Sequence, residues 1–288
     1  MDPSPHEAPF IERAFVRLAE GQIHLRRLAA VDPEAVPVVL LHASPASSWF
    51  MQPLMLALRA GGYMGEIIAP DTLGNGDSSP PSVDEPDIAY FADALRRLLD
   101  GLEVDRADVY GTHTGARIAC EFAAAYPDRT HRLVLDGITE YQDELRDAVI
   151  AHYAPVVEPD EYGRHLIWAF NFCRDQALYF PHFTKAPENR LAVPIPPPAI
   201  LHRITLDVLK ALDTYPKPYI AAFRYRAFER MPMVAAPTLL LKPEGELALL
   251  NQSVETALSL LPDGRAATVA NIEAKAAAIC AFLQGTPA

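Results

Sequence analysis

Short apolar segments that alternate with amphipathic helical segments constrain the fold of this 288-residue chain more than any other feature. Continuous apolar runs of this length are typical of strands buried on both faces of a sheet. The predicted strands are residues 36–41, 66–70, 107–111 and 132–135. The predicted helices between them are residues 49–60, 88–99 and 114–125. This alternation predicts an α/β fold whose sheet is mostly parallel, with right-handed crossover connections.

The pattern begins with a hairpin and is interrupted late in the chain. Residues 11–18 and 22–28 are predicted as two antiparallel strands joined by the turn at Glu20-Gly21. From about residue 139 to 232 the segments are helical, aromatic and interrupted by prolines. The alternation then resumes with predicted strands at 238–241 and 266–270 and predicted helices at 252–261 and 272–282. We therefore predict a core of residues 1–138 and 233–288 and a helical cap of residues 139–232, over the strand ends where such sheets bind ligands.

Composition narrows the classes of function. The formal net charge of −12 argues against nucleic acid and anionic membranes as partners. Residues 1–10 lack an apolar signal core, and no run reaches the ~18 apolar residues of a membrane span, so we expect a soluble, cytoplasmic protein. The three cysteines, Cys120, Cys173 and Cys280, are widely spaced in apolar helical patterns and are predicted to be buried thiols. We expect no cofactor and no metal, and both a monomer and a homodimer remain open.

The segment Val109–Ala116 carries the most specific motif. It joins the end of a strand to the start of a helix through Gly111-Thr112-His113-Thr114-Gly115. A glycine-flanked turn of this kind, G-x-S-x-G in many hydrolases, exposes its central side chain above the sheet. Here the central residue is His113.

Two further loops support a family resemblance. Leu40–Ser48 resembles an H-G-x-P loop, and Asp71–Ser78 resembles a D-x-x-G-x-G-x-S loop. Together with the glycine-flanked turn at His113, called the elbow below, these loops resemble the motifs of the α/β-hydrolase fold superfamily in order and spacing. The resemblance covers residues 10–138 and 237–283, and the cap matches only as a type of insertion.

The resemblance implies an oxyanion hole and an acid. One oxyanion donor would be the backbone N–H of Thr114, and the other would come from Ser44, with Ala43 next to it. The acid would be Glu246, which follows the penultimate strand, with Glu244 as the fallback. Some members place the acid at the position of Asp136 instead.

The sequence departs from this family at two positions. His113 stands where the family has Ser, Asp or Cys, and no histidine follows His202 to serve as the usual base. A Ser-His-Asp triad is therefore excluded. A neutral imidazole can act as a base or a nucleophile, so we expect His113 to be catalytic, with Asp136 or Glu246 within about 4 Å of a ring nitrogen. The alternative is an inert histidine at a site that has lost its function.

Four further side chains are candidates for substrate binding. Trp168, Phe172 and Phe180 would form an apolar pocket wall, and the same aromatic run also fits the cap's own core. His42 is the fourth candidate, although a bond to the backbone of its own loop is the other interpretation. No His/Asp/Glu group has the spacing of a metal site.

Three hypotheses about function follow. The first is an enzyme that acts on a small apolar carbonyl or acyl compound by hydrolysis or a related base-catalysed reaction, with cofactor-free lyase or oxygenase chemistry as a variant. The second is a catalytically silent ligand-binding protein. The third, a scaffold, fits poorly with a full cap and an intact oxyanion loop.

Overall fold

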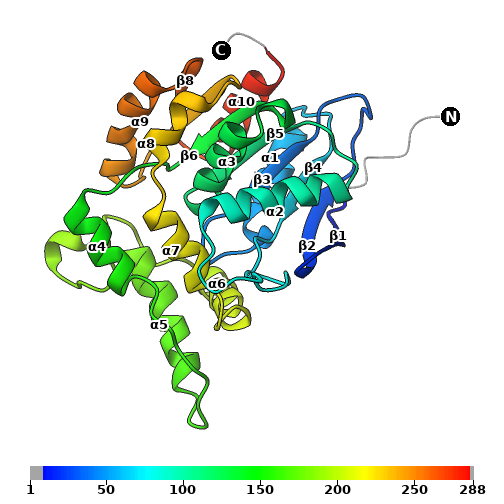
Figure 1. Cartoon of the computed structure of the whole chain (residues 1–288). Helices are drawn as coiled ribbons and strands as arrows, with labels where there is room; N and C mark the ends of the chain where they lie inside the picture. Colours follow the sequence, from blue (N-terminus) through cyan, green and yellow to red (C-terminus); the bar gives the residue numbers. More distant parts are fainter. Residues whose placement is uncertain (1–8, 286–288) are drawn as a thin grey trace.

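Eight strands form one sheet within residues 9–285, the part of the chain that the computed structural model describes (Figure 1). Their order is β1-β2-β4-β3-β5-β6-β7-β8. Strand β2 pairs antiparallel with β1 and β4, and all other neighbours are parallel. The strands are β1 (Glu12–Leu18), β2 (Gly21–Leu28), β3 (Val38–Leu41), β4 (Ile67–Pro70), β5 (Ala107–Thr112), β6 (Thr130–Asp136), β7 (Thr238–Pro243) and β8 (Gly264–Val269). This confirms the predicted α/β sheet with its N-terminal hairpin.

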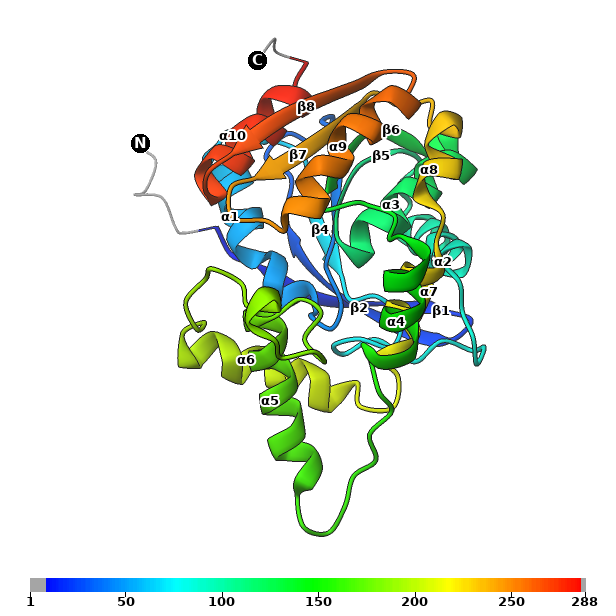
Figure 2. The same cartoon turned by 90° about the vertical axis from the view of Figure 1, so that its left-hand side faces the viewer.

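Helices cover both faces of the sheet (Figures 1 and 2). Helices α1 (Gln52–Ala60) and α10 (Ile272–Leu283) pack on one face, where they share a buried cluster with Leu40 and Ile67. On the other face lie α2 (Ile88–Gly101), α3 (Thr114–Ala125) and α9 (Ala248–Leu260). The sheet is therefore the middle of three layers.

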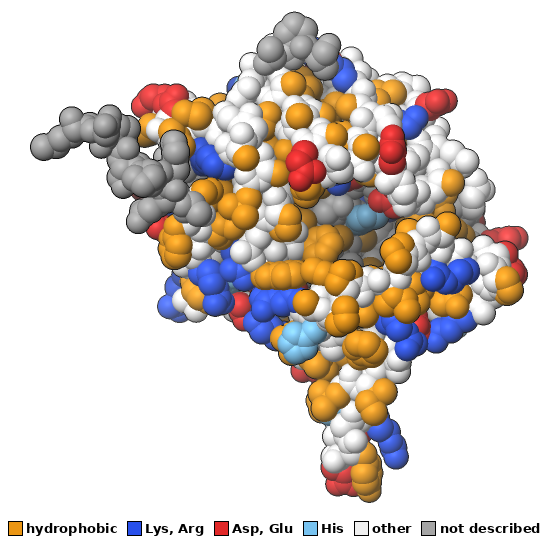
Figure 3. Space-filling model, turned by 180° about the vertical axis from the view of Figure 1, so that it is seen from behind, with side chains coloured by type: hydrophobic (Ala, Val, Ile, Leu, Met, Phe, Trp, Pro, Cys, Tyr) orange, Lys and Arg blue, Asp and Glu red, His pale blue; other side chains and the backbone are white. Residues whose placement is uncertain are grey.

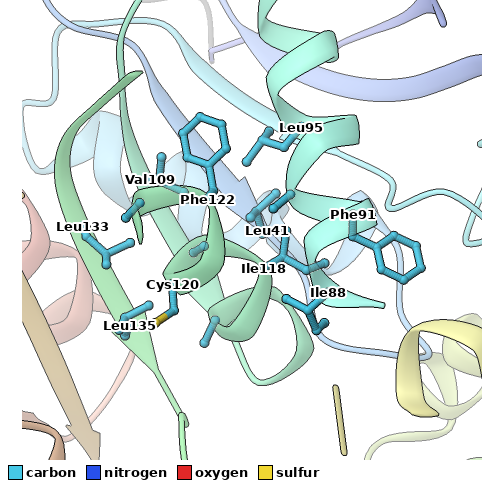
Figure 4. Close-up of a cluster of buried hydrophobic side chains, with 14 of the residues drawn as sticks. Leu41, Ile88, Phe91, Leu95, Val109, Ile118, Cys120, Phe122, Leu133 and Leu135 are labelled. Atoms are coloured by element: carbon cyan, nitrogen blue, oxygen red, sulfur yellow. The ribbon is translucent and has the colours of Figure 1, made fainter. Parts of the chain in front are cut away.

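The larger of the two core clusters lies under α3. Figure 4 shows side chains of α2 and α3, including Leu95, Ile118 and Phe122, against Val109 and Leu133 of the sheet. All residues of β3, β4 and β5 are buried, as expected of parallel strands covered on both faces. The elbow between β5 and α3 therefore rests on a fully packed base.

One of two helix starts differs from the sequence prediction. Helix α2 begins at Ile88 as predicted, and Asp87 caps it, because the Asp87 side chain accepts the N–H of Tyr90 at 2.8 Å. Ser47 accepts the N–H of Trp49, but the turn that follows is a 3₁₀-helix, and α1 begins only at Gln52. Pro53 then occupies the first turn of α1, where its missing N–H costs no hydrogen bond.

Residues 139–232, which the sequence predicts as a cap and which are called the cap segment below, form helices between β6 and β7 with an aromatic cluster of their own. These are α4 (Asp143–His152), α5 (Arg164–Leu178), α6 (Pro198–Lys210), α7 (Pro216–Arg224) and α8 (Ala227–Arg230), with short 3₁₀-helices at Pro187–Asn189 and Met231–Met233. Ala221 of α7, Ala227 of α8 and Met231 belong to the core cluster, so the end of this segment packs directly on α3. A buried hydrogen bond of 2.8 Å from Ser47 to Asp207 ties α6 to the loop after β3.

Helix α5 projects from the body of the molecule (Figure 2). Figure 3 shows hydrophobic side chains over this projecting end, where Leu166, Ile167 and Phe170 are exposed. None of the helices in the described part of the chain is long and apolar enough to cross a membrane. The three cysteines are buried and unpaired, which confirms their prediction as buried thiols.

Asp108, at the start of β5, gives a prediction for stability against pH. Its carboxylate is buried between Tyr63 and His131, whose Nδ1 lies 2.8 Å from Oδ1. Burial raises the pKa of Asp108 to about 6, although His131 opposes this. A raised folded pKa gives stability that is complete below about pH 4 and is lost as the pH rises through about 6, by about 3 kcal/mol.

Replacing Asp108 by Asn keeps the shape and removes the titration. Urea denaturation at several pH values should therefore show a shallower loss of stability between pH 4 and 6.5 in Asp108→Asn than in the wild type. Equal slopes in the two proteins would contradict the raised pKa.

Candidate active site

His113 lies on a tight turn between β5 and α3. Its backbone has φ 49° and ψ −106°, a conformation that costs energy in any residue with a side chain. The flanking glycines make the turn possible: a Cβ on Gly111 would lie 2.1 Å from the Gly115 oxygen, and one on Gly115 would lie 2.3 Å from the Leu41 oxygen. The backbone of this site therefore has the form of a nucleophile elbow, with an imidazole at its apex.

The imidazole of His113 packs against Gly137, just after β6. A Cβ at this glycine would lie 3.0 Å from the ring's Nδ1 and 3.3 Å from Nε2, so a side chain would crowd the ring, and the φ of +72° also favours glycine. The His113 N–H donates to the Asp136 carbonyl at 2.9 Å, which fixes the turn to β6. The side chain is 41% exposed. The ring is thus held from below and open above.

The carboxylate that meets this ring belongs to Glu246. Its Oε2 lies 3.3 Å from His113 Nε2, and its side chain is only 16% exposed in the loop between β7 and α9. Burial acts to raise the pKa of Glu246, but the His113 contact, the Leu247 N–H and the Lys275 charge outweigh burial and hold the pKa below its ordinary value. A proton on Nε2 facing this carboxylate leaves the Nδ1 lone pair free.

Asp136, the other predicted acid, is engaged elsewhere. Its carboxylate, on a residue that is 2% exposed, accepts the Tyr110 hydroxyl at 2.7 Å and Lys275 Nζ at 2.5 Å. The structure therefore brings Glu246, and not Asp136, to the His113 ring. Lys275 stands in the first turn of α10, the helix that follows the last strand.

The residues of the predicted oxyanion hole, Ala43, Ser44 and Thr114, line the same cavity as His113. In the described part of the chain, the N–H groups of Ser44 and Thr114 have no recorded acceptor. Thr114 is the first residue of α3, so its N–H also points out of the positive end of a helix. Free donors of this kind can stabilise a developing oxyanion.

The cavity has a volume of about 250 Å³, which suits a small ligand. Its wall comes from the elbow, the loop after β7 and the cap segment. The lining residues are Ala43, Ser44, His113, Thr114, Arg117, Tyr141, Tyr153, Gln176, Phe180, Leu191, Tyr219, Ala222, Phe223, Glu246, Leu247 and Leu250. Most of the cap's contribution is aromatic, and its tyrosines were not identified from the sequence.

Three of the four predicted substrate-binding residues lie away from this wall. Phe180 lines the cavity, whereas Trp168 and Phe172 stack on each other in the cap's own cluster, with ring centroids 4.8 Å apart. His42 is 1% exposed, and both its nitrogens are used, by the Ala43 carbonyl and the Thr72 N–H. His42 therefore bonds to the backbone of its own loop and of the neighbouring loop. The predicted substrate contact of His42 is wrong.

One group of potential metal ligands occurs among the described residues. His24, Asp71 and Asp77 place one ligand atom each within 4.8 Å of one another. Arg13 donates to His24 and Asp77, and Lys210 donates to Asp77 at 2.6 Å. These cationic side chains already neutralise the group, so it is a salt-bridge network.

Comparison with known proteins agrees with this architecture. The model of the α/β-hydrolase fold family matches residues 36–153, which include the elbow and both loops before it. The chain has the α/β-hydrolase fold. The whole fold is also similar to a hydrolase from Pseudomonas aeruginosa PA01, with a TM-score of 0.68 at 18% identity over 95% of this chain and 98% of that one. Epoxide hydrolase A from Mycobacterium thermoresistibile gives a TM-score of 0.68 at 20% identity, over 97% of this chain and 99% of that one.

Several curated relatives of this chain are named as hydrolases, and others are named only as uncharacterized proteins. A 2-hydroxy-6-oxo-2,4-heptadienoate hydrolase of Pseudomonas putida is 31% identical over 40% of this chain and 42% of its own length. A 2-hydroxy-6-oxononadienedioate/2-hydroxy-6-oxononatrienedioate hydrolase of Paraburkholderia xenovorans is 35% identical over 43% of each chain. The chain thus matches less than half the length of these relatives. Their names support a hydrolase.

Proposed function

We propose that this protein is an enzyme of hydrolase type that acts on a small carbonyl or acyl compound, with His113 as its base. The contact of 3.3 Å between His113 and Glu246, at a cavity that also holds free backbone N–H groups, carries the proposal. A largely buried carboxylate costs free energy unless it has a partner. A relative that has lost its activity would have no need to keep Glu246 beside His113.

The arrangement supports proton transfer rather than attack by a serine. Glu246 holds the proton on Nε2, and Nδ1 accepts a proton from water or from an acidic hydroxyl of the substrate. The oxygen of the substrate's carbonyl group lies against the N–H groups of Thr114 and Ser44, which stabilise its developing negative charge. The relatives' printed names describe compounds with a hydroxyl, a ketone and a carboxylate, which we take as the first substrate class to test.

A panel of substrates tests the proposal. Aryl acetates, lactones and 2-hydroxy-6-oxodienoates are assayed with the wild type and with His113→Ala. We expect saturable turnover of a hydroxy-oxo-dienoate that His113→Ala loses. Turnover of aryl acetates should be weak, because an oxyanion hole without its triad leaves only roughly 10³-fold over water.

Two outcomes would contradict this function. Strong aryl esterase activity that a serine-directed phosphonate abolishes would mean that a serine nucleophile carries the reaction, and not base catalysis by His113. Binding of these compounds without turnover would favour the silent ligand-binding protein.

A further inference from the structure

A buried arginine in the cavity wall has no carboxylate partner. Arg117 lies one helical turn after His113 on α3, lines the same cavity and is 4% exposed. A guanidinium group remains charged at all ordinary pH values. Within residues 9–285, no carboxylate oxygen lies within 4.0 Å of its nitrogens. Arg230, which packs against the same helix, is instead paired with Glu121 at 2.8 Å.

The hydrogen bonds of Arg117 leave donors unused. One terminal nitrogen donates to the His113 carbonyl at 3.0 Å, the other donates to the Thr139 carbonyl at 2.9 Å, and Nε has no partner. Because a guanidinium has five N–H groups, three remain. Two carbonyl dipoles satisfy two N–H groups but do not neutralise a buried positive charge. An anion is therefore the missing partner.

The surroundings of Arg117 define the rest of this ligand. The free N–H groups at the start of α3 add positive potential on the same side of the cavity. Glu246 is the one acidic residue of the wall, and it faces His113. The remaining wall is mainly aromatic, and the Tyr141 ring lies 5.9 Å from the guanidinium. A flat, unsaturated body attached to an anionic group fits these surfaces.

We propose that Arg117 binds the carboxylate of a small unsaturated acid and so makes the enzyme selective for anionic substrates. The binding of the acid by Arg117 does not depend on catalysis. Only the statement that the acid is a substrate rests on the proposed function. It also adds a charged group to the expectation from sequence, which was a small apolar carbonyl or acyl compound. The net charge of −12 would repel such an acid at long range, so the local charge of Arg117 must attract it.

Binding of a matched pair of ligands tests the proposal without turnover. Sorbate, a six-carbon dienoate, and sorbamide, its primary amide, have the same shape and differ in charge. Isothermal titration calorimetry at pH 7.5 should give the wild type a Kd for sorbate at least tenfold below that for sorbamide. Equal affinities, or no measurable binding of sorbate, would overturn the proposal.

Variants then assign the effect to one side chain. Arg117→Met should lose the preference, and Arg117→Lys should keep part of it. Arg224→Met, at an exposed arginine on α7, is the matched control and should keep all of it. A preference that survives in Arg117→Met would overturn the assignment, and if this variant does not fold, the comparison of the two ligands in the wild type still decides.

His113→Ala separates this inference from the proposed function. The variant should bind sorbate with the wild-type preference, since it keeps Arg117. Retained preference together with no turnover by the wild type would reject the proposed catalysis and support the anion site. Turnover by the wild type with no preference for sorbate over sorbamide would support the proposed catalysis and reject the anion site.

Discussion

Replacing Glu246 by Gln is expected to reduce kcat/KM for any substrate by about as much as His113→Ala, roughly 10²–10⁴-fold. The two side chains act as a unit, because the carboxylate holds the Nε2 proton in place and stabilises the imidazolium formed during proton transfer. An amide oxygen accepts the same hydrogen bond but supplies no charge. The double variant should therefore be no slower than either single variant.

The neighbouring acid provides the control. Glu244 lies two residues earlier in the same loop, is exposed, and was the other acid suggested there by the sequence. Glu244→Gln should keep kcat/KM within about twofold of the wild type. If Glu246→Gln behaves like this control while His113→Ala is inactive, His113 works without a carboxylate partner.

The same pair gives a direction for pH dependence. The pKa of Glu246 lies below its ordinary value, so its contribution to stability is present above the ordinary pKa and is lost as the pH falls through the lower folded value. Urea denaturation across this acidic range measures the loss of stability, and Glu246→Gln should lack it.

The elbow and the sheet could be predicted because they depend on local sequence. A Cβ at Gly111 or at Gly115 would collide with neighbouring backbone atoms, so the turn requires glycine at both positions. The spacing of the two glycines in the sequence therefore predicts the turn. Buried parallel strands such as β3 appear as continuous apolar runs. The order of these elements then places the Glu246 loop beside the elbow.

The cap contacts could not be predicted in the same way. Trp168 and Phe172 look like Phe180 in the sequence, but whether an aromatic ring faces the cavity depends on how helices of the cap pack against one another. Arg117 did carry a local signal, since a residue four positions after His113 lies on the same face of α3. Its missing carboxylate partner is visible only in three dimensions.

Sequence left two acids open as the partner of His113, and Lys275 explains why the structure uses Glu246 and not Asp136. Asp136 ends the strand next to the elbow, which correctly predicted its proximity to His113. Sequence alone gave no sign that a lysine from α10 would reach this carboxylate, since Lys275 and Asp136 are 139 positions apart. A buried carboxylate is directed by its strongest cation, and here that cation draws it away from the imidazole.

Removing that cation should have the largest effect on stability. Lys275→Met is expected to lower the free energy of unfolding by about 3 kcal/mol, because it leaves the Asp136 carboxylate buried with only the Tyr110 hydroxyl as partner. Urea denaturation followed by circular dichroism measures the change. Lys242→Met is the control, since Lys242 forms no ion pair within residues 9–285 and should change stability by less than about 0.5 kcal/mol.

A second substitution decides whether the buried charge is the cause. Asp136→Asn in the Lys275→Met background removes the unpaired charge and keeps the acceptor for Tyr110, so most of the lost stability should return. No recovery would mean that Lys275 stabilises through packing of its carbon chain instead. The backbone oxygen of Asp136 holds the His113 N–H, so a carboxylate that moves to find water would also loosen the elbow. Activity should therefore fall in Lys275→Met and recover with stability in the double variant, which links the buried pair below the turn to the imidazole above it.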